Sequence, residues 1–216
     1  MVKKIIYTLS LLLLVEHVSA QSDSLLKKII AHTTIGGYAD ASYQRDFNTA
    51  NSTLNINRFV LLVAHQFNDR ISVFSELEVE DAKVSGGEEG GEVALEQAYL
   101  QFQLNKQHYL VAGLFISRLG ILNEDHLPTG FNGTERNRVE TFLIPSTWRE
   151  IGVGLYGNMQ RLPVSYSLGI TNGLNSAGFE HGTGIREGRF EGRNANANCM
   201  AVSGSVQFNP LVIPKL

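Results

Sequence analysis

The segment Val164-Ser-Tyr-Ser-Leu-Gly-Ile-Thr171 alternates apolar and polar residues without interruption. Its even-numbered residues are valine, tyrosine, leucine and isoleucine, and its odd-numbered residues are serine, glycine and threonine. Successive side chains of an extended strand point to opposite faces of a sheet, so this segment would present one apolar and one polar face. The alternation therefore predicts a β-strand.

Seven further segments alternate in the same way or are apolar enough to form strands. They are Ile35–Tyr43, Leu54–Phe67, Ile71–Glu80, Ala94–Leu104, His108–Arg118, Ile151–Tyr156 and Met200–Phe208. Within the fourth of these, we expect Ala94 and Ala98 on the face opposite Gln97 and Gln101. Several segments are longer than the about 5–6 residues typical of soluble sheets. A tilted strand of about 9–11 residues is long enough to cross a membrane.

The connections between these segments alternate in length. The short ones are Gln66–Arg70, Asn105–Gln107 and Asn158–Pro163, and the long ones are Ser85–Glu92, Gly120–Trp148 and Gly173–Asn198. Asn68 and Asn105 supply the side-chain chemistry of tight turns. Short turns at one end and long loops at the other are typical of outer-membrane barrels. We therefore predict an all-β fold, a transmembrane antiparallel β-barrel.

Residues 1–20 have the layout of a secretory signal peptide. Lys3 and Lys4 precede an apolar stretch, and Ala20 ends a small-x-small cleavage site. The stretch is shorter than the about 20 apolar residues that a membrane-spanning helix needs; an N-terminal anchor is the alternative. We expect residues 21–32 to form a short periplasmic segment, with an amphipathic helix over 22–31, and residues 33–216 to form one barrel domain.

Composition excludes several classes of protein. The 216 residues include 18 Lys+Arg and 21 Asp+Glu, a net charge of −3, which argues against a nucleic-acid partner. Hydrophobic residues make up 43% and charged residues 18%, which excludes an intrinsically disordered chain. A single cysteine excludes a disulfide scaffold and the cysteine-rich zinc sites.

Five segments are similar to outer-membrane porins of the phosphate-selective O/P family of Bacteroidetes-type bacteria. They are Arg58-Phe-Val-Leu-Leu-Val-Ala-His-Gln-Phe-Asn-Asp69, Leu95-Glu-Gln-Ala-Tyr-Leu-Gln-Phe102, Ala112-Gly-Leu-Phe115, Arg149-Glu-Ile-Gly-Val-Gly-Leu155 and Gly169-Ile-Thr-Asn-Gly-Leu174. The resemblance covers most of residues 33–208. It implies a barrel behind the signal peptide, with a long third external loop, here 120–148, that folds inward and narrows the pore.

The chain departs from that family in strand number. Such barrels have about 16 strands, and eight segments are found here. The last residues, Asn209-Pro-Leu-Val-Ile-Pro-Lys-Leu216, contain two prolines that disfavour a central strand. We expect the chain to carry roughly the first half of a porin; a complete eight-stranded barrel is the alternative.

Glu76, Glu78 and Glu80 alternate along one strand and would share one face about 6.5–7 Å apart. In a barrel they form an acidic ladder in the water-filled lumen, joined there by Gln97 and Gln101. A phosphate path would instead need stacked basic residues. Two alternatives remain. One is a secreted β-jelly-roll glycosidase with Glu76 as nucleophile and Glu80 as acid/base. The other is a calcium site formed by Glu78, Glu80, Asp81 and Glu88.

Charged residues of both signs occupy the 120–148 loop and its flanks. The basic ones are Arg118, Arg136, Arg138 and Arg149, and the acidic ones are Glu124, Asp125, Glu135 and Glu140. Opposed acidic and basic rows across a constriction would orient and select ions. The alternative is a solvated surface loop whose charges have no specific role.

Aromatic residues near strand ends have two interpretations. Phe67, Tyr99, Tyr109, Tyr166 and Phe208 fit an aromatic girdle at a membrane interface or packing in an ordinary core.

The leading hypothesis is an outer-membrane porin that passes small hydrophilic solutes or ions by diffusion, anions such as phosphate among them. Its partners are outer-membrane lipid and the solutes, and the sequence leaves a homotrimer and a monomer both open. Because diffusion breaks no bond, the hypothesis predicts no enzymatic activity, catalytic residue, metal or cofactor.

Overall fold

A computed structural model describes residues 29–81, 91–119, 123, 126–133, 136–137, 139, 141, 143, 147–160, 162–190 and 192–208. The predicted signal peptide at 1–20 and residues 209–216 lie outside this part of the chain. Two units are distinguished, 1–34 and 35–216. In the first, the described residues form a helical turn at 29–31, and the Thr33 hydroxyl donates to the Ile29 carbonyl at 2.5 Å. Most of the predicted 22–31 helix lies outside the described residues.

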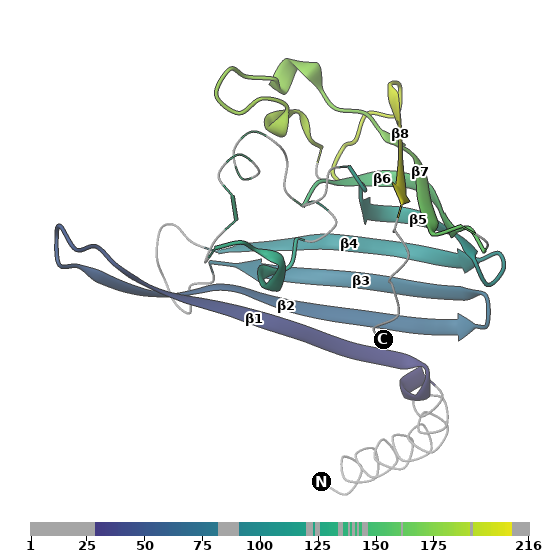
Figure 1. The fold of residues 1–216 in the computed structure, drawn as a ribbon, viewed down its shortest axis with the longest axis horizontal. Helices are drawn as coiled ribbons and strands as arrows, with labels where there is room; N and C mark the ends of the chain where they lie inside the picture. The colour runs from purple at the N-terminus through teal and green to yellow at the C-terminus, as the bar shows by residue number, and fades with distance from the viewer. Residues whose placement is uncertain are drawn as a thin grey trace, which may run out of the picture. The chain divides into compact units, whose positions relative to one another are not determined.

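The fold is all-β, as predicted. One sheet contains the strands β1 (Thr33–Arg45), β2 (Ser52–Asn68), β3 (Ile71–Glu80), β4 (Glu92–Gln103), β5 (His108–Ile116), β6 (Arg149–Asn158), β7 (Val164–Asn172) and β8 (Met200–Phe208). Strands adjacent in the chain are adjacent in the sheet, and β2 to β8 pair antiparallel. Within the described residues β8 does not pair with β1, so the sheet is not closed. In Figure 1 the later strands turn out of the plane of β2–β4.

Sequence alternation predicts the strand bounds closely. β3 and β8 have the predicted bounds, whereas β1 and β2 extend beyond the predicted segments at both ends. The extension continues to the tip of the β1–β2 hairpin, where the Tyr43 hydroxyl donates to Ser52 Oγ at 3.1 Å. Strand pairing is a backbone property and continues where the apolar pattern has already ended.

Connections alternate in length along the sheet, as predicted. The β2–β3, β4–β5 and β6–β7 turns lie at one end, and the longer connections, together with the β1–β2 hairpin, lie at the other (Figure 1). Asn68 Oδ1 accepts hydrogen bonds from the backbone of Arg70 at 2.9 Å and Ile71 at 3.0 Å. Asn105 Oδ1 accepts equivalent bonds from Gln107 and His108. These asparagines close the turns as expected.

A β-bulge in β4 corrects one prediction. Glu76 pairs with Gln97 but Leu77 pairs with Leu95, so Glu96 is an extra residue in the ladder. Ala94 pairs with Glu78 and therefore shares its face. The prediction that Ala94 lies on the same face as Ala98 is wrong, because one inserted residue moves every position beyond it to the other face.

The two faces of the sheet differ in an unusual way. Glu78 exposes 4% of its surface, while the adjacent Leu77 exposes 39%. We name the two faces by their residues. The covered face carries Arg58, Val60, Glu76, Glu78, Tyr99, Val111, Phe115, Glu150, Tyr156 and Thr171; the bare face carries Phe59, Leu77, Val93, Leu95, Leu100, Ile151, Val153, Leu168, Ile170, Val202 and Val206. Charged residues are thus buried while large apolar residues are exposed, the reverse of a soluble sheet.

In the described part of the chain, no helix is long and apolar enough to cross a membrane.

Gly113 provides a test of the β4–β5 register. Its φ is +139°, and an added Cβ would lie 2.8 Å from Tyr99 Cα. We expect Gly113→Ala to lower the free energy of unfolding by more than about 1 kcal/mol, because the side chain is incompatible with both the backbone angle and the neighbouring strand. The measurement is urea unfolding of the folded protein. Gly36→Ala is the control, since a Cβ there meets nothing within 4 Å. Equal losses in both variants would contradict the register.

Candidate functional site

A cavity of about 440 Å³ lies over the covered face and is lined mainly by charged side chains. Its carboxylates are Asp40, Glu78, Glu80, Asp81, Glu92 and Glu96, and its guanidinium groups are Arg58, Arg136, Arg149, Arg186 and Arg189. Every described loop that reaches this cavity comes from the end of the sheet with the long connections.

The charges around the cavity are segregated by element. All six carboxylates come from β1, β3, β4 and the residue directly after β3. Four of the five arginines come instead from the β5–β6 loop, the start of β6 and the β7–β8 loop. Arg58 of β2 is the exception. The acidic residues predicted for the opposed rows, Glu124, Asp125, Glu135 and Glu140, lie outside the described residues, and the described carboxylates of the cavity come from strands and the residue after β3.

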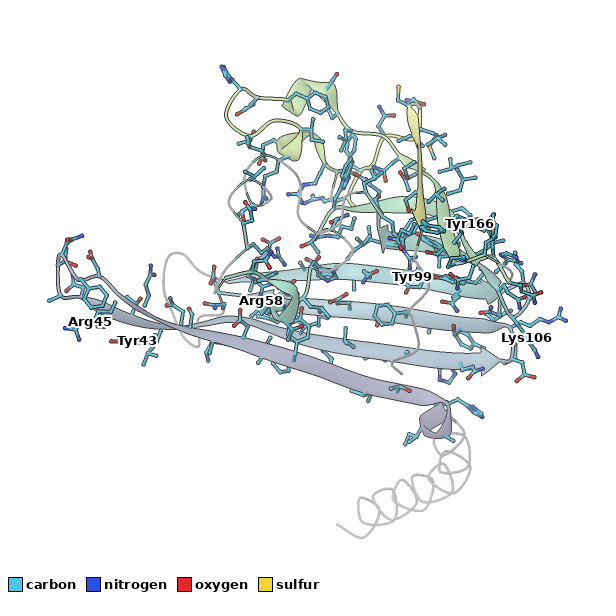
Figure 2. The ribbon with its side chains drawn as sticks, in the orientation of Figure 1. Tyr43, Arg45, Arg58, Tyr99, Lys106 and Tyr166 are labelled. Carbon is cyan, nitrogen blue, oxygen red and sulfur yellow. The ribbon has the colours of Figure 1, made fainter. Side chains whose placement is uncertain are left out.

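Arg58 lies among three carboxylates. Its Nη1 is 3.3 Å from Glu78 Oε1, its Nη2 is 3.5 Å from Glu80 Oε1, and its Nε is 3.7 Å from Asp40 Oδ2. The side chains of Arg58 and Glu78 are more than nine-tenths buried, so each charge needs the other. Arg58 of β2 is labelled in Figure 2. Arg58 and Asp40 are not among the site residues predicted from the sequence. Pairing β2 with β3 would have indicated Arg58, which lies opposite Glu80 in the ladder.

Arg149 and Glu96 form a second buried pair. Arg149 Nη1 donates to Glu96 Oε1 at 2.7 Å, and both side chains are at most 10% exposed. Arg149 was a candidate from sequence, but Glu96 was not, because its inward position follows from the bulge.

Glu76 and Gln97 meet as predicted. Gln97 Nε2 donates to Glu76 Oε2 at 2.7 Å, and His126 Nε2 lies 3.7 Å from Glu76 Oε1. Both glutamates of the glycosidase hypothesis are therefore engaged by protein partners, Glu76 by Gln97 and His126, and Glu80 by Arg58. Gln101 shares the covered face but bonds to Gln103 at 3.4 Å, away from the charged cavity.

Described residues of the 120–148 loop lie against the covered face. His126 reaches Glu76, and the Phe131 ring lies 6.0 Å from the Arg58 guanidinium and 5.8 Å from that of Arg136. Burial, together with the nearby Arg58 charge, lowers the pKa of the Arg136 guanidinium from its ordinary value. Arg138 lies outside the described residues.

Asn123 holds the two ends of this loop together. Its amide donates to the carbonyls of Ser117 and Trp148, at 2.5 and 3.2 Å, and its Oδ1 accepts from the Trp148 backbone at 2.6 Å. Trp148 Nε1 then donates to Glu150 Oε1 at 2.8 Å, which connects the loop to β6. Asn123 is not among the site residues predicted from the sequence, since an isolated asparagine in a loop carries no pattern.

A smaller cavity of about 130 Å³ lies farther along the covered face. Tyr109 and Tyr156 stack with ring centroids 5.2 Å apart, and the Arg118 guanidinium lies 4.4 Å from the centre of the Tyr156 ring. Arg118 lines this smaller cavity together with Tyr99 and Gln97. Tyr99 (labelled in Figure 2) and Tyr109 thus pack on the covered face and do not belong to a membrane girdle.

Within the described ranges, no group of three or more histidine, cysteine, aspartate or glutamate side chains is arranged to hold a metal ion. Glu88 of the calcium alternative lies outside those ranges.

The Arg149–Glu96 pair generates a stability prediction. We expect Arg149→Gln to lower the free energy of unfolding by about 3–5 kcal/mol, because it leaves Glu96 buried without its counter-charge. Urea unfolding measures the loss. Glu187→Gln is the control: the Arg186–Glu187 pair is separated by 3.6 Å and exposed by 30% and 55%, so its removal costs less than about 1 kcal/mol. A small loss for Arg149→Gln would show that water already screens Glu96.

Comparison with known proteins gives one informative match. The chain is 33% identical over 178 residues to a protein of Aquifex aeolicus (strain VF5) that is itself described as uncharacterized. The aligned region covers 81% of this chain and 40% of that relative, so the chain spans about two fifths of the relative's length. No protein-family model and no solved structure matches the chain.

Proposed function

We propose that this chain is part of an outer-membrane porin through which small hydrophilic solutes diffuse. The observation that carries the proposal is the reversed burial of the sheet. Its bare face is apolar and its covered face holds charges, which is the arrangement of a strand between lipid and a water-filled lumen.

The charges of the covered face support the same proposal. Burying charged groups in an apolar core is unfavourable unless they are paired or hydrated. Here carboxylates and arginines surround an open space of about 440 Å³, which suits a hydrated passage. The apolar residues of the bare face, in contrast, extend across the strands from β2 to β8 with nothing from the described chain over them. Lipid acyl chains would cover such a surface.

Aromatic residues mark one boundary of the proposed membrane-spanning band. Phe102, Tyr166 and Phe208 lie on the bare face, close to the end of the sheet with the short turns. The Phe67 ring lies 4.8 Å from that of His65, which is on the same face. Aromatic girdles occupy this position in outer-membrane barrels. The short turns would then face the periplasm and the long loops the exterior.

A closed barrel requires partners for the outer edges of β1 and β8. Lipid offers no hydrogen bonds, so an open edge cannot remain in a membrane. We propose that these eight strands belong to a barrel of about 16, the size typical of porins. The resemblance to the phosphate-selective O/P family supports this size. The proposed passage includes no chemical step, and hence no catalytic residue or cofactor, and its assembly as a homotrimer is part of the same proposal.

Solute entry into liposomes tests the function. Liposomes that carry the full-length protein purified from membranes should swell in isosmotic arabinose, because the lumen admits small hydrophilic molecules. Light scattering follows the swelling. Liposomes prepared with the same detergent but without protein are the control, and vesicles that stay sealed despite folded protein would refute the proposal.

Two adjacent residues of β4 test which face meets lipid. Leu100 lies on the bare face and Gln101 on the covered face, at nearly the same depth. We expect Leu100→Arg to destabilise the folded protein in bilayers by more than about 1 kcal/mol, because Leu100 lies one step inside the proposed aromatic boundary at Phe102 and the cost rises toward the bilayer midplane. Gln101→Arg should have little effect because its side chain faces water. Urea unfolding in lipid vesicles measures both. Equal tolerance of the two arginines would contradict the assignment of the faces.

A further inference from the structure

We infer that the charged cavity selects dipolar solutes of dipeptide size, which carry an ammonium group at one end and a carboxylate at the other. This inference rests on the proposed porin function and names the class of solute that the passage favours.

The charge balance of the cavity argues against selection for simple ions. Six carboxylates and five guanidinium groups line the described part of the cavity, so their charges nearly cancel. An ion of either sign is attracted by one group of side chains and repelled by the other. A passage for phosphate would need basic residues in excess, whereas the acidic residues here are in slight excess.

The segregation of the charges favours a solute with two poles. The carboxylates belong to β1, β3, β4 and the residue after β3, while Arg136, Arg149, Arg186 and Arg189 belong to the loops and the start of β6. The two sets meet at the Arg149–Glu96 pair, and Arg58 of β2 lies among the carboxylates. A zwitterion can turn its ammonium group toward the first set and its carboxylate toward the second. Clefts lined by charge concentrate solutes of opposite charge, and a zwitterion is attracted by both sets at once.

Several of the lining groups are accessible enough to meet a solute. Asp81 and Glu92 are exposed. The Glu80 side chain is 45% exposed although it lies 3.5 Å from Arg58, and the Arg186 side chain is 30% exposed beside Glu187, whereas Arg58 and Glu78 are buried against each other. Glu80 and Arg186 are accessible groups of opposite sign that substitutions can test. The cavity volume of about 440 Å³ lies within the range of sites that hold small molecules.

Four peptides of similar size separate the effects of charge. The probes are zwitterionic glycylglycine, anionic N-acetylglycylglycine, cationic glycylglycinamide and uncharged N-acetylglycylglycinamide. Their entry into liposomes that carry the full-length protein is measured by rapid sampling at neutral pH. We expect glycylglycine to enter at least about threefold faster than either singly charged peptide, because only the zwitterion is attracted by both charged sets.

Matched variants assign the preference to the cavity. Glu80→Gln should slow glycylglycine relative to the uncharged peptide and speed the anionic one, and Arg186→Gln should speed the cationic one. Asp69→Asn and Lys106→Gln remove the same charges from exposed turns at the other end of the sheet, and should leave the ranking unchanged.

The outcomes distinguish the inference from the porin proposal. Equal rates for all four peptides, or fastest entry of the anionic peptide, would overturn the inference and leave the porin intact. No entry of any peptide, together with vesicles that stay sealed to arabinose, would overturn the porin proposal itself.

Discussion

The structure depends on one constraint, the period-two alternation that places charged residues and large apolar residues on opposite faces of the same strands. Glu76, Glu78 and Arg58 are buried because loops fold over their face. Leu77 and Phe59, their neighbours in the chain, remain exposed. In water this arrangement would be unfavourable on both counts, since it exposes apolar surface and buries charge. In the proposed outer-membrane setting, lipid against the bare face and water over the covered face would remove both costs.

The buried charges also explain how the long loop is held. His126 approaches Glu76, and the Phe131 ring lies 6.0 Å from the Arg58 guanidinium and 5.8 Å from that of Arg136. Asn123 joins the two ends of the loop through the backbone of Ser117 and Trp148. The charged side chains of the covered face thus supply contacts for described residues of the loop. The charged side chains of the covered face therefore both contact the loop and set the electrostatics of the cavity.

The bulge at Glu96 shows how a single residue shapes this site. Regular pairing would allow only alternate residues of β4 to face the cavity. The extra residue brings Glu96 to Arg149 while Gln97 still reaches Glu76. Bulges commonly redirect a side chain beside a functional site, and here the redirected carboxylate supplies the counter-charge for the first residue of β6.

The sequence alone determined where the strands lie, the alternation of apolar and polar side chains along them, and the turn chemistry of Asn68 and Asn105. These features depend on neighbours within a few residues. The sequence also identified Glu76, Glu78, Gln97, Arg136 and Arg149 as candidates from local pattern and charge. Only the tertiary structure decided that Arg58 meets Glu78 and Glu80, that Glu96 meets Arg149, and that Asn123 holds the loop. Those contacts join residues distant in the chain, and they follow from strand register, from one bulge and from loop packing, none of which leaves a local signal in the sequence.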